Sequence, residues 1–269
     1  MAPEFPGAAD GRRTMDLLWG REQSARTRGP KPALDPEQIV RAAIELADAE
    51  GLEAVSMRRV AERLGAGAMS LYTYIPGKAE LLELMLDRVL AEPSADAPED
   101  AEGWRAALEQ RAREMWRHYQ RHPWTLQVSA ARATLGPNEL ASYQRALATV
   151  VDLGLPARET VAMVDALAMF VRGAAQQAAE AERAAEATGK SETDWWYERE
   201  ATLTEVMADH KFPVLDRLGA EGGFDVPEDE TNYNLRFALD DFEFGLQRLL
   251  DGFEAHVNVA KRRREPALD

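Results

Sequence analysis

The residues with the clearest chemical purpose lie between positions 68 and 78. Leu71 and Ile75 stand four residues apart, so both fall on one face of a short helix and can anchor it to a core. That spacing turns the small and aromatic side chains of Ala68, Met69, Tyr72 and Thr73 outward. Side chains of this size can enter the major groove of DNA. Lys78 then opens another helix, whose amino-terminal amides and dipole suit a DNA phosphate.

Two helices upstream are expected to position this segment. Asp35 and Gln38 have the spacing of a capping box, ahead of a helix that Gly51 ends. Ser56 caps the next helix, and Gly65 makes the turn that follows it. The apolar face of that helix consists of Met57, Val60, Ala61 and Leu64, which leaves Arg58, Arg59 and Arg63 outside. The pattern predicts a helix-turn-helix DNA-binding domain over residues 36–81.

Residues 36–85 resemble the tetracycline-repressor (TetR) family of transcriptional regulators. The resemblance rests on residues 55–65, on Leu71-Tyr72 and on residues 77–82. It implies a set of residues at the DNA, to which the outward-facing Thr73 is added: Arg58, Ala68, Met69, Ser70, Tyr72, Tyr74 and Lys78. Within that set, Arg58, Ala68 and Met69 are best placed for base edges, whereas Tyr72, Tyr74 and Lys78 are expected to clamp phosphates. Gly67 stands where Ser or Thr often caps the recognition helix in this family, and glycine caps almost as well.

The charge of the chain is unevenly distributed. The formal net charge is −15, yet residues 1–90 carry 12 Lys and Arg against 14 Asp and Glu, so the acidity belongs mainly to the rest. Residues 1–34 are rich in Pro, Gly and Arg and are expected to form a flexible basic arm, with a possible short helical turn at residues 14–19. Within this arm, Arg26, Arg28 and Lys31 are expected to follow the minor groove or the DNA backbone.

The remaining sequence indicates an all-α protein, because helical spacing recurs to about residue 260 and no alternating strand pattern is found. Residues 93–100 interrupt this periodicity and mark the predicted domain boundary. We therefore expect a helix-turn-helix domain at residues 35–92 and a larger helical effector-binding and dimerisation domain at residues 103–262. Within the larger domain, the apolar spacing from Trp104 to Tyr119 predicts a helix that Pro123 stops. Further helices are predicted at residues 124–134, 138–153, 157–187, 193–209 and about 232–260.

The larger domain resembles, more diffusely, the ligand-binding and dimerisation domain of the TetR family. The resemblance implies a homodimer in which residues 157–187 and 232–260 of each subunit form a bundle and present two recognition helices to a palindromic operator. A stripe of small residues agrees with close helix packing: Val161, Val164, Ala168, Val171, Ala175 and Ala178.

A second stripe and several tryptophans are the candidate lining of a pocket for a small apolar or drug-like effector, although such a stripe is also typical of an ordinary core. These residues are Trp116, Trp124, Met163, Leu167, Phe170, Ala174, Gln177, Trp195 and Trp196. Gln177 stands where the founding family member carries an acidic magnesium-site residue. A tetracycline–magnesium complex is therefore not the expected effector.

Other chemistries are less well supported. His118 and His122 are four residues apart but have no third metal ligand nearby, so they are interpreted as histidines that complement a helix dipole. Asp240, Asp241 and Glu243 lack the turn spacing of an aspartate-rich magnesium motif. No metal site, cofactor motif or catalytic triad stands out.

The sequence thus predicts a DNA-binding repressor, released from its operator by an effector. A ligand-independent regulator or an activator is the alternative, and a helical enzyme with an accessory DNA-binding domain is the least favoured. The chain has no cysteine and no apolar run of the roughly 18 residues that a membrane span needs, so the cytoplasm is the expected compartment.

Overall fold

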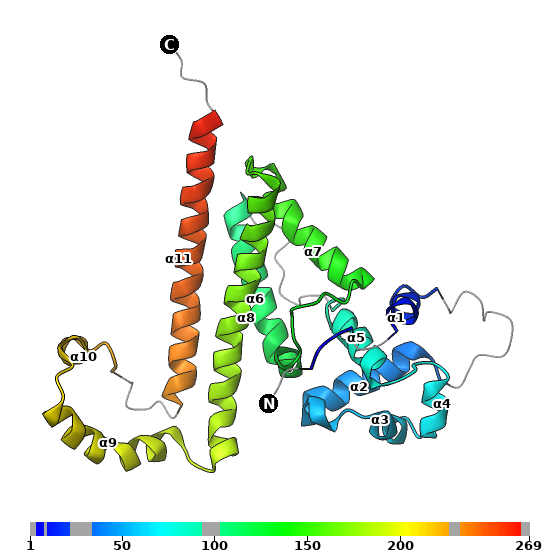
Figure 1. Cartoon of the computed structure of the whole chain (residues 1–269), viewed down its shortest axis with the longest axis horizontal. Coiled ribbons are helices and arrows are strands. Elements are labelled where there is room, and N and C mark those ends of the chain that lie inside the picture. The colour runs from blue at the N-terminus through cyan, green and yellow to red at the C-terminus, as the bar shows by residue number, and fades with distance from the viewer. Residues whose placement is uncertain (1–3, 8–9, 22–33, 93–102, 226–231, 265–269) are drawn as a thin grey trace. The chain divides into compact units, whose positions relative to one another are not determined.

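The structure is a computed structural model that describes residues 4–7, 10–21, 34–92, 103–225 and 232–264. The described residues form helices and no strand, apart from one isolated parallel bridge between Glu4 and Val128 (Figure 1). The all-α prediction is confirmed. The first helices are α1 (Gly11–Leu18), α2 (Pro36–Glu50), η2 (Leu52–Ala54), α3 (Met57–Arg63), α4 (Ala68–Tyr72) and α5 (Lys78–Val89). The later ones are α6 (Gly103–Arg121), η3 (Pro123–Gln127), α7 (Pro137–Val150), η4 (Val151–Leu153), α8 (Ala157–Thr188), α9 (Glu192–Asp209), α10 (Pro213–Ala220) and α11 (Tyr233–Arg264).

The chain divides into two compact units. One unit consists of residues 1–172 and 250–269, and the other consists of residues 173–249. The helix-turn-helix segment and the first part of the larger predicted domain therefore belong to the same unit. The predicted boundary at residues 93–100 lies outside the described residues, and the division at that point stays a prediction.

The helix-turn-helix segment has a continuous apolar core. Ile39, Val60, Leu71 and Ile75 are fully buried in it, together with side chains from α5. The same cluster includes Trp124 and Val128, which come from the region after α6. The core of the DNA-binding segment thus extends into residues that follow the predicted domain boundary.

A second connection joins α5 to α7. Asp87 is buried on α5, and its Oδ1 atom accepts hydrogen bonds from the backbone N–H groups of Asn138 and Glu139 at 3.0 and 2.9 Å. A carboxylate in this position satisfies amides at the start of α7 that have no partner within the helix. A Cβ atom on Gly136 would collide with the same carboxylate, so a glycine is needed where the two helices meet.

The prediction of a helix over residues 124–134 is wrong. Only the short η3 helix forms there, because the backbone carbonyls of this segment accept hydrogen bonds from outside it. The guanidinium of Arg172 on α8 donates to the carbonyl oxygens of Thr125, Leu126 and Val128, at 3.4, 2.9 and 2.7 Å. α10 was also not predicted.

The first part of the predicted basic arm contains a helix where the sequence allowed a short helical turn at residues 14–19. Residues 11–18 form α1, which Asp10 caps and in which Thr14 and Leu18 are buried. Residue 4 pairs with the segment after η3: the Glu4 N–H donates to the Gln127 carbonyl at 3.1 Å, and the Ser129 N–H donates to the Glu4 carbonyl at 2.7 Å. We call residues 4–7 and 10–18 the amino-terminal strap, because their contacts tie α5 to the segment after η3.

Candidate nucleic-acid interface and ligand cavity

The recognition helix α4 is anchored on one side and exposed on the other. Leu71 and Ile75 have no exposed surface, which confirms that they anchor the helix to the core. Met69 is 78% exposed and Tyr72 is 43% exposed, although both are large and apolar or aromatic. Ser70 and Thr73 are exposed beside them, and Ala68 is partly exposed. An exposed patch of this kind on a short helix is suited to contact with base edges and sugar–phosphate groups.

Local interactions fix the helices around α4. The Asp35 carboxylate accepts the Gln38 N–H at 2.8 Å and the Gln38 side chain accepts the Asp35 N–H, so the predicted capping box is confirmed. The Ser56 hydroxyl accepts the Arg59 N–H at 3.3 Å, as predicted. Gly65 has a φ of +64°, a left-handed conformation that favours glycine, and thereby makes the turn between α3 and α4.

Three arginines lie on the outer face of α3, and each of them pairs with a carboxylate. Arg58 donates to Glu62 at 2.8 Å, and this hydrogen bond, together with the negative charge of Glu62, raises the pKa of Arg58. Arg59 and Arg63 pair with Glu50 and Glu45. The Arg58 side chain is 84% exposed, so it can exchange its carboxylate partner for a base edge at little cost.

Lys78, the predicted phosphate clamp, is held by the amino-terminal strap. Its Nζ atom lies 2.9 Å from Oε1 of Glu4, with both side chains partly exposed. The Gly7 N–H donates to Oε1 of Glu83 at 3.0 Å, one helical turn further along α5. Glu4 thus forms an ion pair with the ammonium group that a DNA phosphate would contact. Sequence reasoning missed this pair because the two residues are 74 positions apart.

Replacing Glu4 by glutamine is expected to raise operator affinity. The substitution removes a competitor for Lys78, and an exposed ion pair is worth about 1 kcal/mol or less, which corresponds to a gain of up to about fivefold for each half-site. Fluorescence anisotropy with a labelled operator measures the effect. Glu198→Gln is the matched control, since Glu198 pairs with Lys190 far from α4 in sequence. In a Lys78→Ala background the gain should vanish; a gain that persists there would refute competition for Lys78.

The other predicted DNA contacts have different outcomes. Tyr74 is only partly exposed, at the end of the recognition segment, and packs against the core. Arg26, Arg28 and Lys31 lie outside the described residues. Their contribution to DNA binding stays a prediction, as does the contribution of every residue on the recognition helix.

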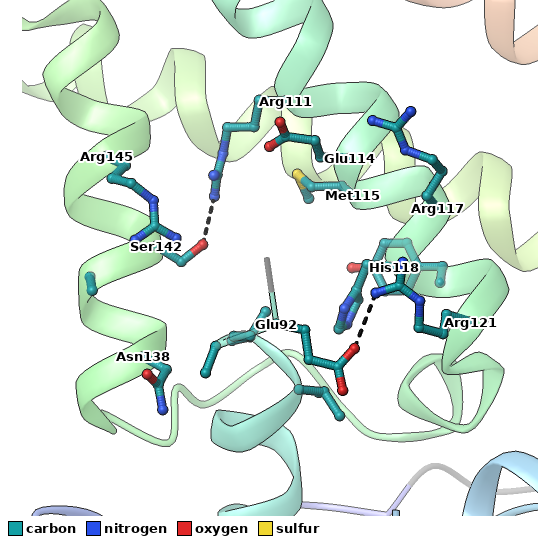
Figure 2. A pocket seen from close by; sticks show the side chains of 15 residues that line it. Glu92, Arg111, Glu114, Met115, Arg117, His118, Arg121, Asn138, Ser142 and Arg145 are labelled. Atoms are coloured by element: carbon teal, nitrogen blue, oxygen red, sulfur yellow. Dashed lines mark hydrogen bonds and ion pairs between the residues drawn. The ribbon is translucent and has the colours of Figure 1, made fainter. Parts of the chain in front are cut away.

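A cavity of about 620 Å³ lies where the end of α5 meets α6 and α7 (Figure 2). One wall comes from residues 89–92, and the other two come from residues 111–121 and 138–145. Its charged lining consists of Arg111, Arg117, Arg121, Arg145, Glu92 and Glu114. A volume of this order suits a small organic ligand. The helix that begins at Lys78 therefore ends at this cavity.

None of the nine side chains predicted to bind an effector lines this cavity. Trp116, Trp124, Met163 and Leu167 are buried in the first unit, and Phe170 is half-buried there. Ala174, Gln177, Trp195 and Trp196 belong to the second unit, where the two tryptophans are about 40% exposed. The role of these nine residues stays a prediction. The cavity was missed because its lining is polar, whereas the sequence search favoured apolar stripes.

A buried histidine connects the rim of the cavity to the helix-turn-helix segment. The Nδ1 atom of His122 lies 2.8 Å from Oδ1 of Asp48 on α2, and its Nε2 atom lies 3.2 Å from Oε2 of Glu92. Burial by itself lowers the pKa of His122, but hydrogen bonds with these two carboxylates raise it above the usual value. Trp124 donates to the same Asp48 oxygen at 2.8 Å. We call His122, Asp48, Glu92 and Trp124 the His122 clamp.

The neighbouring His118 behaves differently. Burial, followed by the charge of His122, lowers the pKa of His118 to about 4. A histidine with this pKa is neutral at pH 7, so it does not complement the helix dipole as the sequence suggested. Across the described part of the chain, no group of three or more His, Cys, Asp or Glu side chains is placed to hold a metal ion. Within the same residues, no helix is long and apolar enough to cross a membrane.

The two short helices α3 and α4, joined at Gly65 and presenting an exposed second helix, define a helix-turn-helix DNA-binding protein. Residues 39–85 match the profile described as "Bacterial regulatory proteins, tetR family". Residues 97–257 match the profile described as "Tetracyclin repressor-like, C-terminal domain". The chain belongs to the TetR family of transcriptional regulators, as its sequence motifs suggested.

Similar proteins support this assignment. The HTH-type transcriptional repressor DrrR1 of Streptomyces coeruleorubidus is 43% identical over 266 residues, which cover 98% of this chain and 92% of that protein. Crystal structures of ActR from Streptomyces coelicolor share the fold. The complex with actinorhodin has a TM-score of 0.63 at 26% identity and covers 84% of this chain and 98% of ActR. The complex with (S)-DNPA has a TM-score of 0.59 at 27% identity and covers 85% of this chain and 100% of ActR.

Proposed function

We propose that this chain is a homodimeric transcriptional repressor that a small-molecule effector releases from its operator. The observation that carries the proposal is that α5 begins at Lys78, beside the recognition helix, and ends at the cavity. A ligand that favours one arrangement of α5 over another then changes the position of the recognition helix. The names of the relatives agree: DrrR1 is a repressor, and ActR has been crystallised with two small molecules.

Exposed apolar side chains support the dimer. Met169 on α8 is 69% exposed and Phe244 on α11 is 67% exposed, and large apolar side chains left this open are typical of association surfaces. Four residues of the small-residue stripe, by contrast, are already buried within a single chain: Val164, Val171, Ala175 and Ala178. The partner would therefore pack on the side of α8 that carries Met169.

A direct test starts from operators selected by the purified protein from genomic fragments. We expect a palindromic site with half-sites about one DNA turn apart, bound by two chains with an affinity that falls as salt rises. Small molecules are then screened for release of that site. Failure to enrich any sequence would overturn the regulator assignment. Release by no compound, with tight operator binding intact, would favour the ligand-independent alternative, and increased transcription from a bound promoter would indicate an activator.

The enzyme alternative has no support of its own. The relatives are named regulators, and Asp240 of the acidic run on α11 pairs with Arg236 at 2.9 Å. A carboxylate engaged with an arginine on its own helix is poorly placed to bind a metal ion.

A further inference from the structure

The charged side chains of the cavity are unevenly distributed. Arg111 on α6 and Arg145 on α7 lie on facing helices, with Ser142 beside them (Figure 2). The Arg111 Nη2 atom donates to the Ser142 hydroxyl at 3.2 Å. In the part of the chain that the structure describes, no carboxylate lies within 4 Å of either guanidinium. Their nearest anionic neighbour on α6 is Glu114, which accepts a hydrogen bond from Gln110 at 3.0 Å.

Within the described residues neither guanidinium forms an ion pair, and their two positive charges oppose each other. Arg111 is half-buried and Arg145 is exposed. The pKa of Arg111 is lowered first by burial and then by the positive charge of Arg145, and the negative charge of Glu114 offsets part of this. Arginine side chains form planar forks that match a carboxylate with two parallel hydrogen bonds. An anion placed between Arg111 and Arg145 would offset their repulsion and accept hydrogen bonds from both guanidiniums, of which Arg111 now donates to the Ser142 hydroxyl.

The opposite end of the cavity has a different character. There Arg121 already pairs with Glu92 at 3.1 Å (Figure 2). The remaining lining includes Val89, Leu90, Met115 and Tyr119, which supply apolar and aromatic surface. A ligand that fills the space would therefore place its charged group near Arg111 and its apolar body against α5. The lining thus favours an acid, which narrows the apolar or drug-like effector that the sequence suggested.

From this lining we infer that the cavity binds an organic carboxylate with an aromatic body, whose carboxylate is held by Arg111 and Arg145. The inference rests on the proposed effector function, because it names the chemical class of the effector. It assigns the site to the cavity between α5, α6 and α7, rather than to the tryptophans and apolar stripe selected from the sequence.

The test compares three probes of one shape on the full-length protein without DNA: 9-anthracenecarboxylate, its neutral carboxamide and the cationic 9-anthracenemethylammonium. Calorimetry should show that the carboxylate binds at least about tenfold more tightly than the other two, since hydrogen bonds between charged groups are about twice as strong as neutral ones. Arg111→Gln and Arg145→Gln should each remove about tenfold of the affinity for the carboxylate and leave that for the carboxamide unchanged. Arg158→Gln is the matched control, because Arg158 is exposed on the same unit and lies outside the cavity.

The melting temperature distinguishes a ligand-binding role of the two arginines from a purely structural one. If the two guanidiniums repel each other in the free protein, Arg145→Gln should leave the melting temperature unchanged or raise it, whereas loss of a structural contact would lower it. Equal affinity for all three probes, or tighter binding of the cation, would overturn the inference. Selective carboxylate binding that leaves the operator complex intact would support the site and refute the proposed release.

Discussion

Replacing His122 by alanine is expected to lower the free energy of unfolding by about 2–4 kcal/mol, because removing one partner of a buried ionic cluster leaves the others uncompensated. His122 is only 2% exposed and contacts two carboxylates, Asp48 and Glu92. Both carboxylates retain some solvent contact, which keeps the effect below that of a fully buried pair. Urea denaturation measures the change.

The same substitution should change the pH dependence of stability. The folded state raises the pKa of His122, so its contribution is complete below the unfolded value of about 6.5 and is lost as the pH rises through the folded pKa. The difference in stability between wild type and His122→Ala should therefore shrink as the pH rises above about 6.5. In the folded state His118, whose pKa is about 4, stays neutral over this range.

At acid pH two other groups, Glu92 and His118, each make the folded state less stable as the pH falls. Burial tends to raise the pKa of Glu92, but the hydrogen bond and charge of His122, followed by Arg121, lower it. Its contribution is present above its unfolded pKa and is lost as the pH falls through the folded value. His118 takes up a proton below about pH 6.5 only when the chain unfolds, which also lowers stability on the acid side.

His256→Ala is the control for this experiment. His256 also contacts a carboxylate, Glu159, at 2.7 Å, but its side chain is 54% exposed. An exposed pair of this kind contributes about 0–1 kcal/mol. Equal effects of His122→Ala and His256→Ala would show that the His122 clamp does not stabilise the protein.

The second large effect concerns DNA. The double variant Tyr72→Ala/Lys78→Ala should bind its operator at least about 100-fold more weakly, because a hydrogen bond to a charged group is worth about 1.5–3 kcal/mol and a dimer makes each contact twice. Removing Lys78 from both subunits should also reduce the slope of log affinity against log salt by about 2. Anisotropy titrations over a range of salt concentrations measure both quantities.

The control for this variant is Lys190→Ala, which removes a lysine that is likewise paired with a glutamate. Tyr72 is 43% exposed and Lys78 is partly exposed, so the double variant should unfold at nearly the wild-type temperature. Undiminished affinity in a folded double variant would refute the assignment of both residues to the DNA.

The helix-turn-helix segment could be predicted from the sequence because its determinants are local. The capping box at Asp35 and Gln38, the Ser56 cap and the turn at Gly65 each depend on residues within a few positions. The anchoring of α4 depends only on the spacing of Leu71 and Ile75. Physical rules for single helices therefore suffice for this part of the chain.

The amino-terminal strap and the cavity could not be predicted in this way. The contact of Glu4 with Lys78 joins residues 74 positions apart, and the Arg111–Ser142 hydrogen bond joins residues 31 positions apart. No local pattern marks such partners. Arg172 illustrates the same limit, because its guanidinium holds the carbonyls of Leu126 and Val128, which are 46 and 44 positions away.

Helices keep their backbone hydrogen bonds internal, so two packed helices can slide past each other without breaking any of them. The amino-terminal strap removes this freedom between α5 and the segment after η3. Its backbone is bonded to Gln127 and Ser129 on one side, and Gly7 is bonded to Glu83 of α5 on the other. Displacement of α5 along that segment must break these bonds together. The strap therefore fixes the position of α5 along that segment with hydrogen bonds that packed helices alone do not provide.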